Sequence, residues 1–140
     1  MEPALLLLDE PLSNLDAKLR EKMRFELKRL QRELRITTVY VTHDQGEALA
    51  LSHQIAVMSE GRIRQIGPPR DIYEKPANRF VADFVGTTNF IDGEALAPGR
   101  VRTGIGEVEI VPAELRAGER VVLSVRPEDV ELAETRPEGA

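Results

Sequence analysis

Two acidic residues end an apolar run near the start of the sequence and could together activate a water molecule. Asp9 and Glu10 directly follow the run Ala4–Leu8. An aspartate in this position can hold Mg²⁺, which prefers carboxylate and water ligands. A glutamate beside it can orient and deprotonate a water molecule as a general base. Taken alone, the pattern also fits an acidic turn at the end of a strand.

A histidine follows a second run and could join the two acids. His43 comes directly after Thr37–Thr42, a β-branched and aromatic stretch that is typical of a strand. If the two runs are neighbouring parallel strands, their carboxyl ends meet at one edge of a sheet, where α/β proteins place ligands. A histidine at a strand end is also compatible with a hydrogen-bonded core residue, so its significance depends on this proximity.

The segment between the two runs predicts the helix that would make them parallel. Five apolar residues are spaced by three or four positions and fall on one helical face: Leu19, Met23, Leu27, Leu30 and Leu34. Asp16 is suited to be the N-cap, because its carboxylate can accept a free backbone N–H. Strand, helix and strand in this order predict a βαβ unit with a right-handed crossover.

Further elements are expected along the rest of the chain. They are a helix from about Asp44 to Leu51, strands at Ile55–Met58 and Arg62–Ile66, and short helices at Pro68–Tyr73 and Asn78–Phe84. After Gly86, short β-rich runs alternate with glycine and proline, which predicts a small barrel or sandwich. We therefore expect a first domain over residues 1–86, a partial β domain over 87–133 and a disordered tail over 134–140.

Composition and charge exclude several classes of protein. The 140 residues include no cysteine, so neither disulfides nor thiolate metal sites can form. The first apolar run is too short to span a membrane and lacks the basic stretch of a secretory signal. The segment Ala17–Arg35 holds eight basic and three acidic residues. Because the protein is acidic as a whole and poor in aromatics, we expect a solvated helix face there and no nucleic-acid partner.

Five segments together resemble the ATPase subunits of ABC transporters. LLLLDEPLSNLDAKLR resembles their Walker B strand and D-loop, and VYVTHDQGEAL resembles their switch-histidine segment. EGRIRQIGPPRDIYEKPANRFVADFVG resembles the stretch that closes the nucleotide domain of importer subunits, and GTTNFIDGEA and VRPEDVEL resemble the appended TOBE domain. The resemblance implies an α/β fold: a partial P-loop NTPase parallel sheet of the RecA-like, ABC type with helices, followed by a small all-β, OB-like domain.

The resemblance also implies a role for each matched residue. Asp9 would hold Mg²⁺, mainly through water, and Glu10 would be the general base for the water that attacks ATP. His43 would contact the γ-phosphate and sense its loss. The D-loop, which would face a second subunit across the nucleotide, comprises Ser13, Asn14, Leu15 and Asp16. His53 and Gln54 replace the aspartate and arginine more usual in the family, at a helix-to-strand junction without catalytic consequence.

Several motifs of the family are absent from the sequence. There is no G-x-x-x-x-G-K-[ST] loop to hold phosphates, no Gln-loop and no LSGGQ-type signature. These parts would lie upstream of Met1, and the β domain of the family continues beyond the RPED segment. We therefore expect that the chain alone does not hydrolyse ATP. We also expect an apolar strand edge left without its neighbour, which favours aggregation.

The resemblance favours an importer ATPase subunit for a small solute. Such subunits act as dimers on the cytoplasmic face of the membrane, against a pair of permease subunits supplied by a solute-binding protein. Two alternatives remain: a non-transport ABC ATPase that acts on DNA or ribosomes, and a regulatory, solute-sensing OB module with a vestigial ATPase part. Polyamines, ferric iron, sulfate, molybdate, phosphonates and sugars all remain possible cargoes, and GTTNFIDGEA inclines toward the polyamine and iron relatives.

Overall fold

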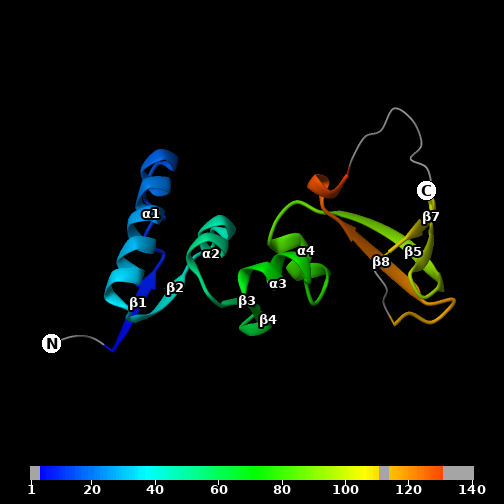
Figure 1. The fold of residues 1–140 in the computed structure, drawn as a ribbon, viewed down its shortest axis with the longest axis horizontal. Coiled ribbons are helices and arrows are strands. Elements are labelled where there is room, and N and C mark those ends of the chain that lie inside the picture. Colours follow the sequence, from blue (N-terminus) through cyan, green and yellow to red (C-terminus); the bar gives the residue numbers. More distant parts are fainter. Residues whose placement is uncertain (1–3, 111–113, 131–140) are drawn as a thin grey trace. The chain divides into compact units, whose positions relative to one another are not determined.

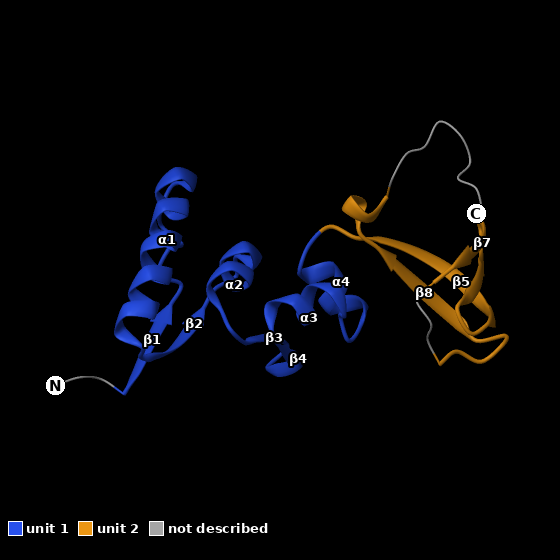
Figure 2. Cartoon of the chain, in the orientation of Figure 1, with its two compact units in different colours: residues 1–86 blue, residues 87–140 orange. Residues whose placement is uncertain are grey.

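The computed structural model describes residues 4–110 and 114–130, which form two compact units, residues 1–86 and 87–140 (Figure 2). Unit 1 contains β1 (Leu5–Asp9), α1 (Ala17–Leu34), β2 (Thr37–Val41), α2 (Gln45–Leu51), β3 (Ile55–Ser59), β4 (Arg62–Gly67), α3 (Pro69–Glu74) and α4 (Arg79–Phe84) (Figure 1). Unit 2 contains β5 (Asn89–Ala97), β6 (Arg100–Thr103), β7 (Gly106–Glu109), β8 (Arg120–Val125) and a 3-10 turn, Pro127–Asp129. The expected tail over 134–140 lies outside the described residues. The expectation of a mixed α/β chain is confirmed.

The first two strands are parallel neighbours, as the βαβ pattern predicts. β1 pairs with β2 in parallel, from Leu5 opposite Thr37 to Asp9 opposite Val41. β3 and β4 form a separate antiparallel hairpin. Within the described residues, the parallel sheet of unit 1 is therefore only two strands wide, and the broader P-loop sheet that the resemblance implies is not seen there.

Helix α1 begins at the N-cap that its sequence predicts. The Asp16 carboxylate accepts a hydrogen bond from the backbone N–H of Leu19 at 2.9 Å, which confirms Asp16 as the N-cap. The helix ends at Arg35, whose left-handed backbone lets its N–H donate to the Gln31 carbonyl. No residue of α1 is buried, and Leu19 and Leu30 of its apolar stripe are each 41% exposed.

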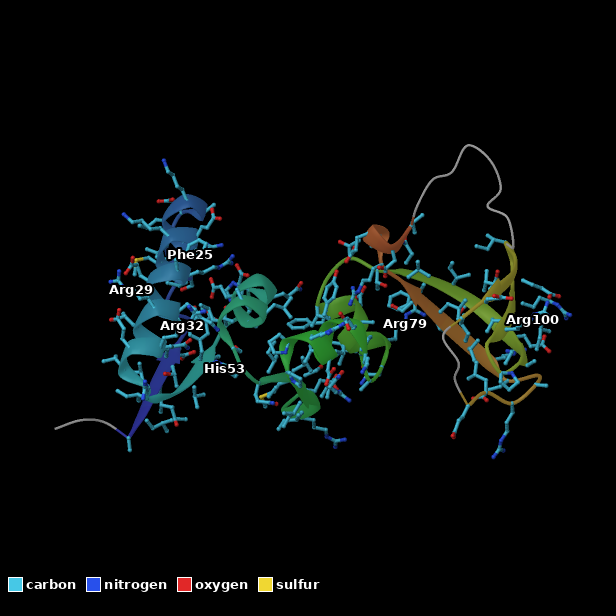
Figure 3. The ribbon with its side chains drawn as sticks, viewed as in Figure 1. Phe25, Arg29, Arg32, His53, Arg79 and Arg100 are labelled. Atoms are coloured by element: carbon cyan, nitrogen blue, oxygen red, sulfur yellow. The ribbon has the colours of Figure 1, made fainter. Side chains whose placement is uncertain are left out.

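The basic side of α1 is not the fully solvated face that its composition suggests. Arg20, Arg24 and Lys28 are half-buried and lie against α2. Lys28 Nζ donates to the Leu51 carbonyl at the end of α2 at 2.7 Å, and burial, aided by nearby Arg32, lowers the pKa of Lys28. The remaining cations include Arg29 and Arg32, which are exposed (Figure 3). The prediction of a solvated face was therefore wrong for the basic stripe of α1 that Arg20, Arg24 and Lys28 form.

The core of unit 1 packs against α2. Its buried members come from β3, α3, α4 and the residue after α4: Ile55, Val57, Ile72, Val81 and Val85. Ala48 and Leu49 of α2 and Tyr73 of α3 pack against this core. The helix that follows His43 is therefore anchored on two sides, by apolar packing and by the basic stripe of α1. His53 lies in the exposed bend between α2 and β3 (Figure 3).

The parallel strand pair exposes much of its apolar surface. Leu5 and Leu7 of β1 are 47% and 68% exposed, and Val39 and Val41 of β2 are 47% and 51% exposed. A two-stranded sheet is marginal by itself, and exposed apolar strands tend to pair with other chains.

None of the helices within residues 4–110 and 114–130 combines the length and apolar character that crossing a lipid bilayer requires.

Unit 2 is a four-stranded antiparallel sheet in the order β7-β6-β5-β8. Ala95 and Val101 are its buried apolar residues on β5 and β6. Arg126, only 7% exposed, donates to the Thr87 carbonyl at 3.1 Å and so ties the end of β8 to the start of the unit. The four strands confirm that the chain after Gly86 is β-rich, as its sequence predicts. The described residues form one sheet, in which the expected barrel or sandwich closure is not seen.

We expect Gly93→Ala to destabilise unit 2 because β5 and β6 approach too closely for a methyl group. A β-carbon at Gly93 would collide with Val101 Cγ1 and lie 2.9 Å from the Arg102 carbonyl. Overpacking of this kind costs about 1–3 kcal/mol of unfolding free energy. Urea denaturation followed through the amide NMR signals of β5 and β8 measures the loss. Gly104→Ala is the matched control, since nothing lies within 4 Å of its β-carbon; equal effects of the two variants would contradict this packing.

Candidate functional site

Glu10 begins the site by turning sharply out of β1. Its N–H donates to the Val41 carbonyl at 2.9 Å, so the β1–β2 ladder continues as far as Glu10. Its backbone then takes a left-handed conformation, with φ of 44°. A non-glycine residue in this region costs on the order of 1–3 kcal/mol and persists only where its surroundings enforce it. Such strain is concentrated at functional sites.

The loop after Glu10 holds this turn in place. The Glu10 carbonyl accepts from both the N–H and the hydroxyl of Ser13, at 3.2 and 3.0 Å. Leu12 is only 2% exposed and so fixes the loop to the body of unit 1, and its carbonyl accepts from the Leu15 N–H. Asp16 closes the loop as the N-cap of α1. The segment therefore has a defined shape, although most of its side chains face solvent.

His43 lies opposite Glu10, in the short connection between β2 and α2. Its Nδ1 is 3.2 Å from Glu10 Oε1. The two side chains are 74% and 46% exposed, so the pair adds little to the stability of the fold. The contact follows from the topology, because parallel pairing brings the carboxyl ends of β1 and β2 to the same edge. A carboxylate and an imidazole are thus available to a ligand from solvent.

A small pocket separates these side chains from the ends of the two helices. Its lining residues are Glu10, Ser13, Arg20, Thr42, His43, Asp44 and Glu47. Its volume is about 20 Å³, which is room for about one water molecule. Among the lining residues, the side chains of Glu10 and His43 are well exposed, whereas Glu47 is only 3% exposed.

The structure brings three of the predicted site residues together and leaves four outside the pocket. Glu10, Ser13 and His43 share the pocket. Asp9 lies at the last paired position of β1, is exposed and does not line it. The loop residues that also lie outside its lining are Asn14, Leu15 and Asp16.

The carboxylates of this edge do not form a closed metal site. Within residues 4–110 and 114–130, no three His, Cys, Asp or Glu side chains are arranged to hold a metal ion. This is compatible with the exposed Asp9 as a magnesium ligand, because Mg²⁺ usually keeps several waters and takes one or two carboxylates with substrate phosphates.

Glu47, which was not predicted from the sequence, is the centre of a hydrogen-bond network beside His43. Glu47 accepts from the Tyr40 hydroxyl and from Thr42 Oγ1, each at 2.8 Å. Burial, followed by the hydrogen bond to Glu47, raises the pKa of Tyr40, so its hydroxyl stays protonated and donates. The spacing from Asp44 to Glu47 is that of a capping box, a signal that could have identified it. Here Glu47 turns instead toward β2.

Asp44 and two arginines complete this network. Asp44 caps α2 by accepting from the Glu47 N–H at 3.0 Å, and its own N–H donates to Thr42 Oγ1 at 3.0 Å. Arg24 Nη2 donates to Asp44 Oδ2 at 2.8 Å, and Arg20 Nη1 lies 3.6 Å from the same oxygen. Both arginines approach Glu47 Oε1 to 3.9 Å. The residues on either side of His43 are therefore held by side chains from α1 and α2.

Comparison with known proteins finds relatives that include several spermidine/putrescine import ATP-binding proteins. The chain is 56% identical over 135 residues to the spermidine/putrescine import ATP-binding protein PotA of Ruegeria pomeroyi, covering 94% of this chain and 37% of that protein. It is 55% identical over 139 residues to the protein of that name from Pseudomonas aeruginosa, covering 95% and 38%, and 50% identical over 152 residues to that of Frankia alni, covering 98% and 33%. The chain thus spans between a third and two fifths of the length of these relatives. No protein-family model matches it.

Proposed function

We propose that this chain works as part of the ATP-hydrolysing subunit of an ABC importer. The resemblance to this family, drawn from five segments of the sequence, is confirmed by relatives at 50–56% identity along nearly the whole chain. The observation that carries the proposal is the 3.2 Å contact between Glu10 and His43 at the edge of the parallel strand pair.

Glu10 is proposed to be the general base. Glu10 lines a pocket with room for about one water molecule, and nearly half of its side chain remains accessible. A carboxylate can accept the proton of a water molecule that attacks phosphorus, and positioned bases of this kind contribute about 10²- to 10⁴-fold in rate. The imidazole of His43 is proposed to contact the γ-phosphate and to hold Glu10 in place.

Asp9 is proposed to bind Mg²⁺, mainly through water. The ion, when bound with ATP, neutralises charge on the phosphates as hydrolysis proceeds. Ser13–Asp16 are proposed to form the D-loop that contacts nucleotide and the second ATPase subunit. The exposed apolar residues of β1 and β2 suit a sheet that further strands complete, and unit 2 is proposed to be part of an OB-like TOBE domain.

The proposed setting is a peripheral complex on the cytoplasmic face of the cell membrane. Two ATPase subunits would bind a pair of permease subunits, which receive cargo from a solute-binding protein. The relatives quoted above are named for spermidine and putrescine import, so we propose polyamines as the cargo class. Polyamines were one of the two classes toward which the sequence inclined.

The regulatory alternative would require a ligand site in unit 2. An open depression of about 690 Å³ lies across β5, β6 and β8, and it is lined by both acidic and basic residues, among them Asp92, Glu94, Arg102 and Arg120. Titration of this chain with polyamines, oxyanions and sugars distinguishes the regulatory alternative from the proposed function. Saturable binding of one of these solutes to unit 2 would favour the regulatory alternative. The non-transport alternative is disfavoured by the import names of the relatives.

A chimeric subunit tests the proposed function. In it, this chain replaces the matching segment of the Pseudomonas aeruginosa relative, to which it is 55% identical. We expect the chimeric subunit to hydrolyse ATP and, with the permease and solute-binding protein of that relative, to support spermidine uptake at a rate comparable to the parent. The measurements are phosphate release and uptake of labelled spermidine into proteoliposomes.

The parent subunit with the segment deleted is the negative control. A chimeric subunit that binds ATP and assembles with the permease, yet neither hydrolyses ATP nor transports, would contradict the proposal.

A further inference from the structure

Arg20 of α1 contacts two other segments of the site through one guanidinium group. Its Nη2 donates to the Leu15 carbonyl in the loop before α1 at 3.0 Å. Its Nη1 lies 3.6 Å from Asp44 Oδ2, and its Nε lies 3.9 Å from Glu47 Oε1, both on the segment after His43. Arg20 also lines the pocket that contains Glu10 and His43.

The backbone around His43 depends on the acids that Arg20 reaches. Thr42 donates to Glu47, and the Asp44 N–H donates to Thr42 Oγ1. The residues before and after His43 are therefore fixed by hydrogen bonds that end on Glu47 and Asp44. Glu47 is almost fully buried, so its charge requires nearby cations. A shift of Arg20 would thus move the histidine segment and the loop together.

Arg24 provides a natural comparison. It contacts the same two acids, and its bond to Asp44 Oδ2, at 2.8 Å, is the shorter one. It is not among the residues that line the pocket. If the arginines served only to neutralise Asp44 and Glu47, loss of Arg24 would slow the reaction at least as much as loss of Arg20.

We propose that Arg20 is a positioning residue that couples the loop Ser13–Asp16 to His43, an inference that rests on the proposed ATP hydrolysis. Arg20 does not touch the reacting groups in this arrangement. It keeps the loop and the histidine segment, whose His43 contacts the Glu10 carboxylate, at one fixed separation. Arginine is suited to this task because its planar fork can donate to the Leu15 carbonyl while its charge stays within ion-pairing distance of two carboxylates.

The test compares Arg20→Gln with Arg24→Gln in the chimeric subunit. We expect Arg20→Gln to lower kcat for ATP by about 10- to 100-fold, as for other small misplacements of reacting groups, with KM nearly unchanged. Arg24→Gln, which leaves the bond of Arg20 to the Leu15 carbonyl intact, is expected to reduce thermal stability as much or more but to lower kcat by a clearly smaller factor. Arg20→Lys keeps the charge but not the fork, so it should also lose kcat, and it takes the place of Arg20→Gln if that variant does not fold.

Equal losses of kcat in the two arginine variants, unchanged kcat in the Arg20 variants, or an effect confined to KM would overturn the inference. Hydrogen exchange measured by mass spectrometry on nucleotide-free subunits gives a second readout that needs no activity. Arg20→Gln should accelerate exchange about fivefold in Ser13–Asp16, as expected for one lost hydrogen bond, and should also accelerate exchange in Thr42–Glu47, where two ion pairs are lost. Arg24→Gln should affect only the second segment. An unsubstituted subunit that fails to hydrolyse ATP would refute the proposed function, and the exchange comparison would then decide the coupling by itself.

Discussion

Glu10→Gln in the chimeric subunit is expected to slow ATP hydrolysis by about 10²- to 10⁴-fold, equivalent to about 3–5 kcal/mol of transition-state stabilisation. The amide preserves the size of the side chain and its position opposite His43, but it cannot accept a proton from water. ATP binding should persist, because the pocket geometry and the phosphate contacts elsewhere in the subunit are unchanged. Phosphate release in single-turnover experiments, together with equilibrium binding of a fluorescent ATP analogue, separates the two effects.

The matched control is Glu33→Gln. Glu33 is exposed near the end of α1 and pairs only at the surface with Arg29. Its amide variant should hydrolyse ATP at the unsubstituted rate. Wild-type turnover in Glu10→Gln, or a loss of ATP binding that explains the loss of turnover, would remove Glu10 from the role of general base.

Glu47→Ala is expected to destabilise this chain by about 2–4 kcal/mol of unfolding free energy. The substitution leaves the Tyr40 and Thr42 hydroxyls without their acceptor and removes a buried partner of Arg20 and Arg24. Unsatisfied buried groups cost about 1–3 kcal/mol each, and breaking a buried ion pair costs about 3–5 kcal/mol. The expected loss of unfolding free energy is below the sum of these costs because Arg20 and Arg24 remain partly exposed. Urea denaturation followed by circular dichroism measures it.

Glu26→Ala is the control that separates burial from distance. Glu26 pairs with Arg29 at 2.9 Å, which is shorter than either contact of Glu47 with an arginine, but the two side chains are 40% and 62% exposed. Its loss should change the unfolding free energy by no more than about 0.5 kcal/mol. If Glu26→Ala proved as costly as Glu47→Ala, burial would not be the source of the stability of this network.

The parallel pairing of β1 and β2 could be predicted because every local signal agreed. A short apolar run, a capped helix with a periodic stripe and a β-branched run permit few topologies. That pairing in turn places Glu10 near His43 without any knowledge of side-chain contacts. The four β-rich runs of unit 2 were recognisable for a similar reason, since glycine and proline mark their ends.

The network around Glu47 could not be predicted in the same way. Arg20, Arg24 and Lys28 are spaced by four along α1, and such a stripe looks the same in sequence whether it faces water or another helix. Only the position of α2 decides that these cations meet Asp44, Glu47 and the Leu51 carbonyl. The left-handed backbone of Glu10 was equally hidden, because glutamate has no preference for it.

A crystal structure of the chimeric subunit carrying Glu10→Gln, bound to Mg²⁺ and ATP, tests most directly whether Glu10 and His43 act on the same phosphate group of ATP. Our account predicts that the His43 ring contacts the γ-phosphate and that the side chain at position 10 contacts a water molecule in line with it. A γ-phosphate bound away from the carboxyl ends of β1 and β2, or a His43 ring directed away from it, would contradict the account.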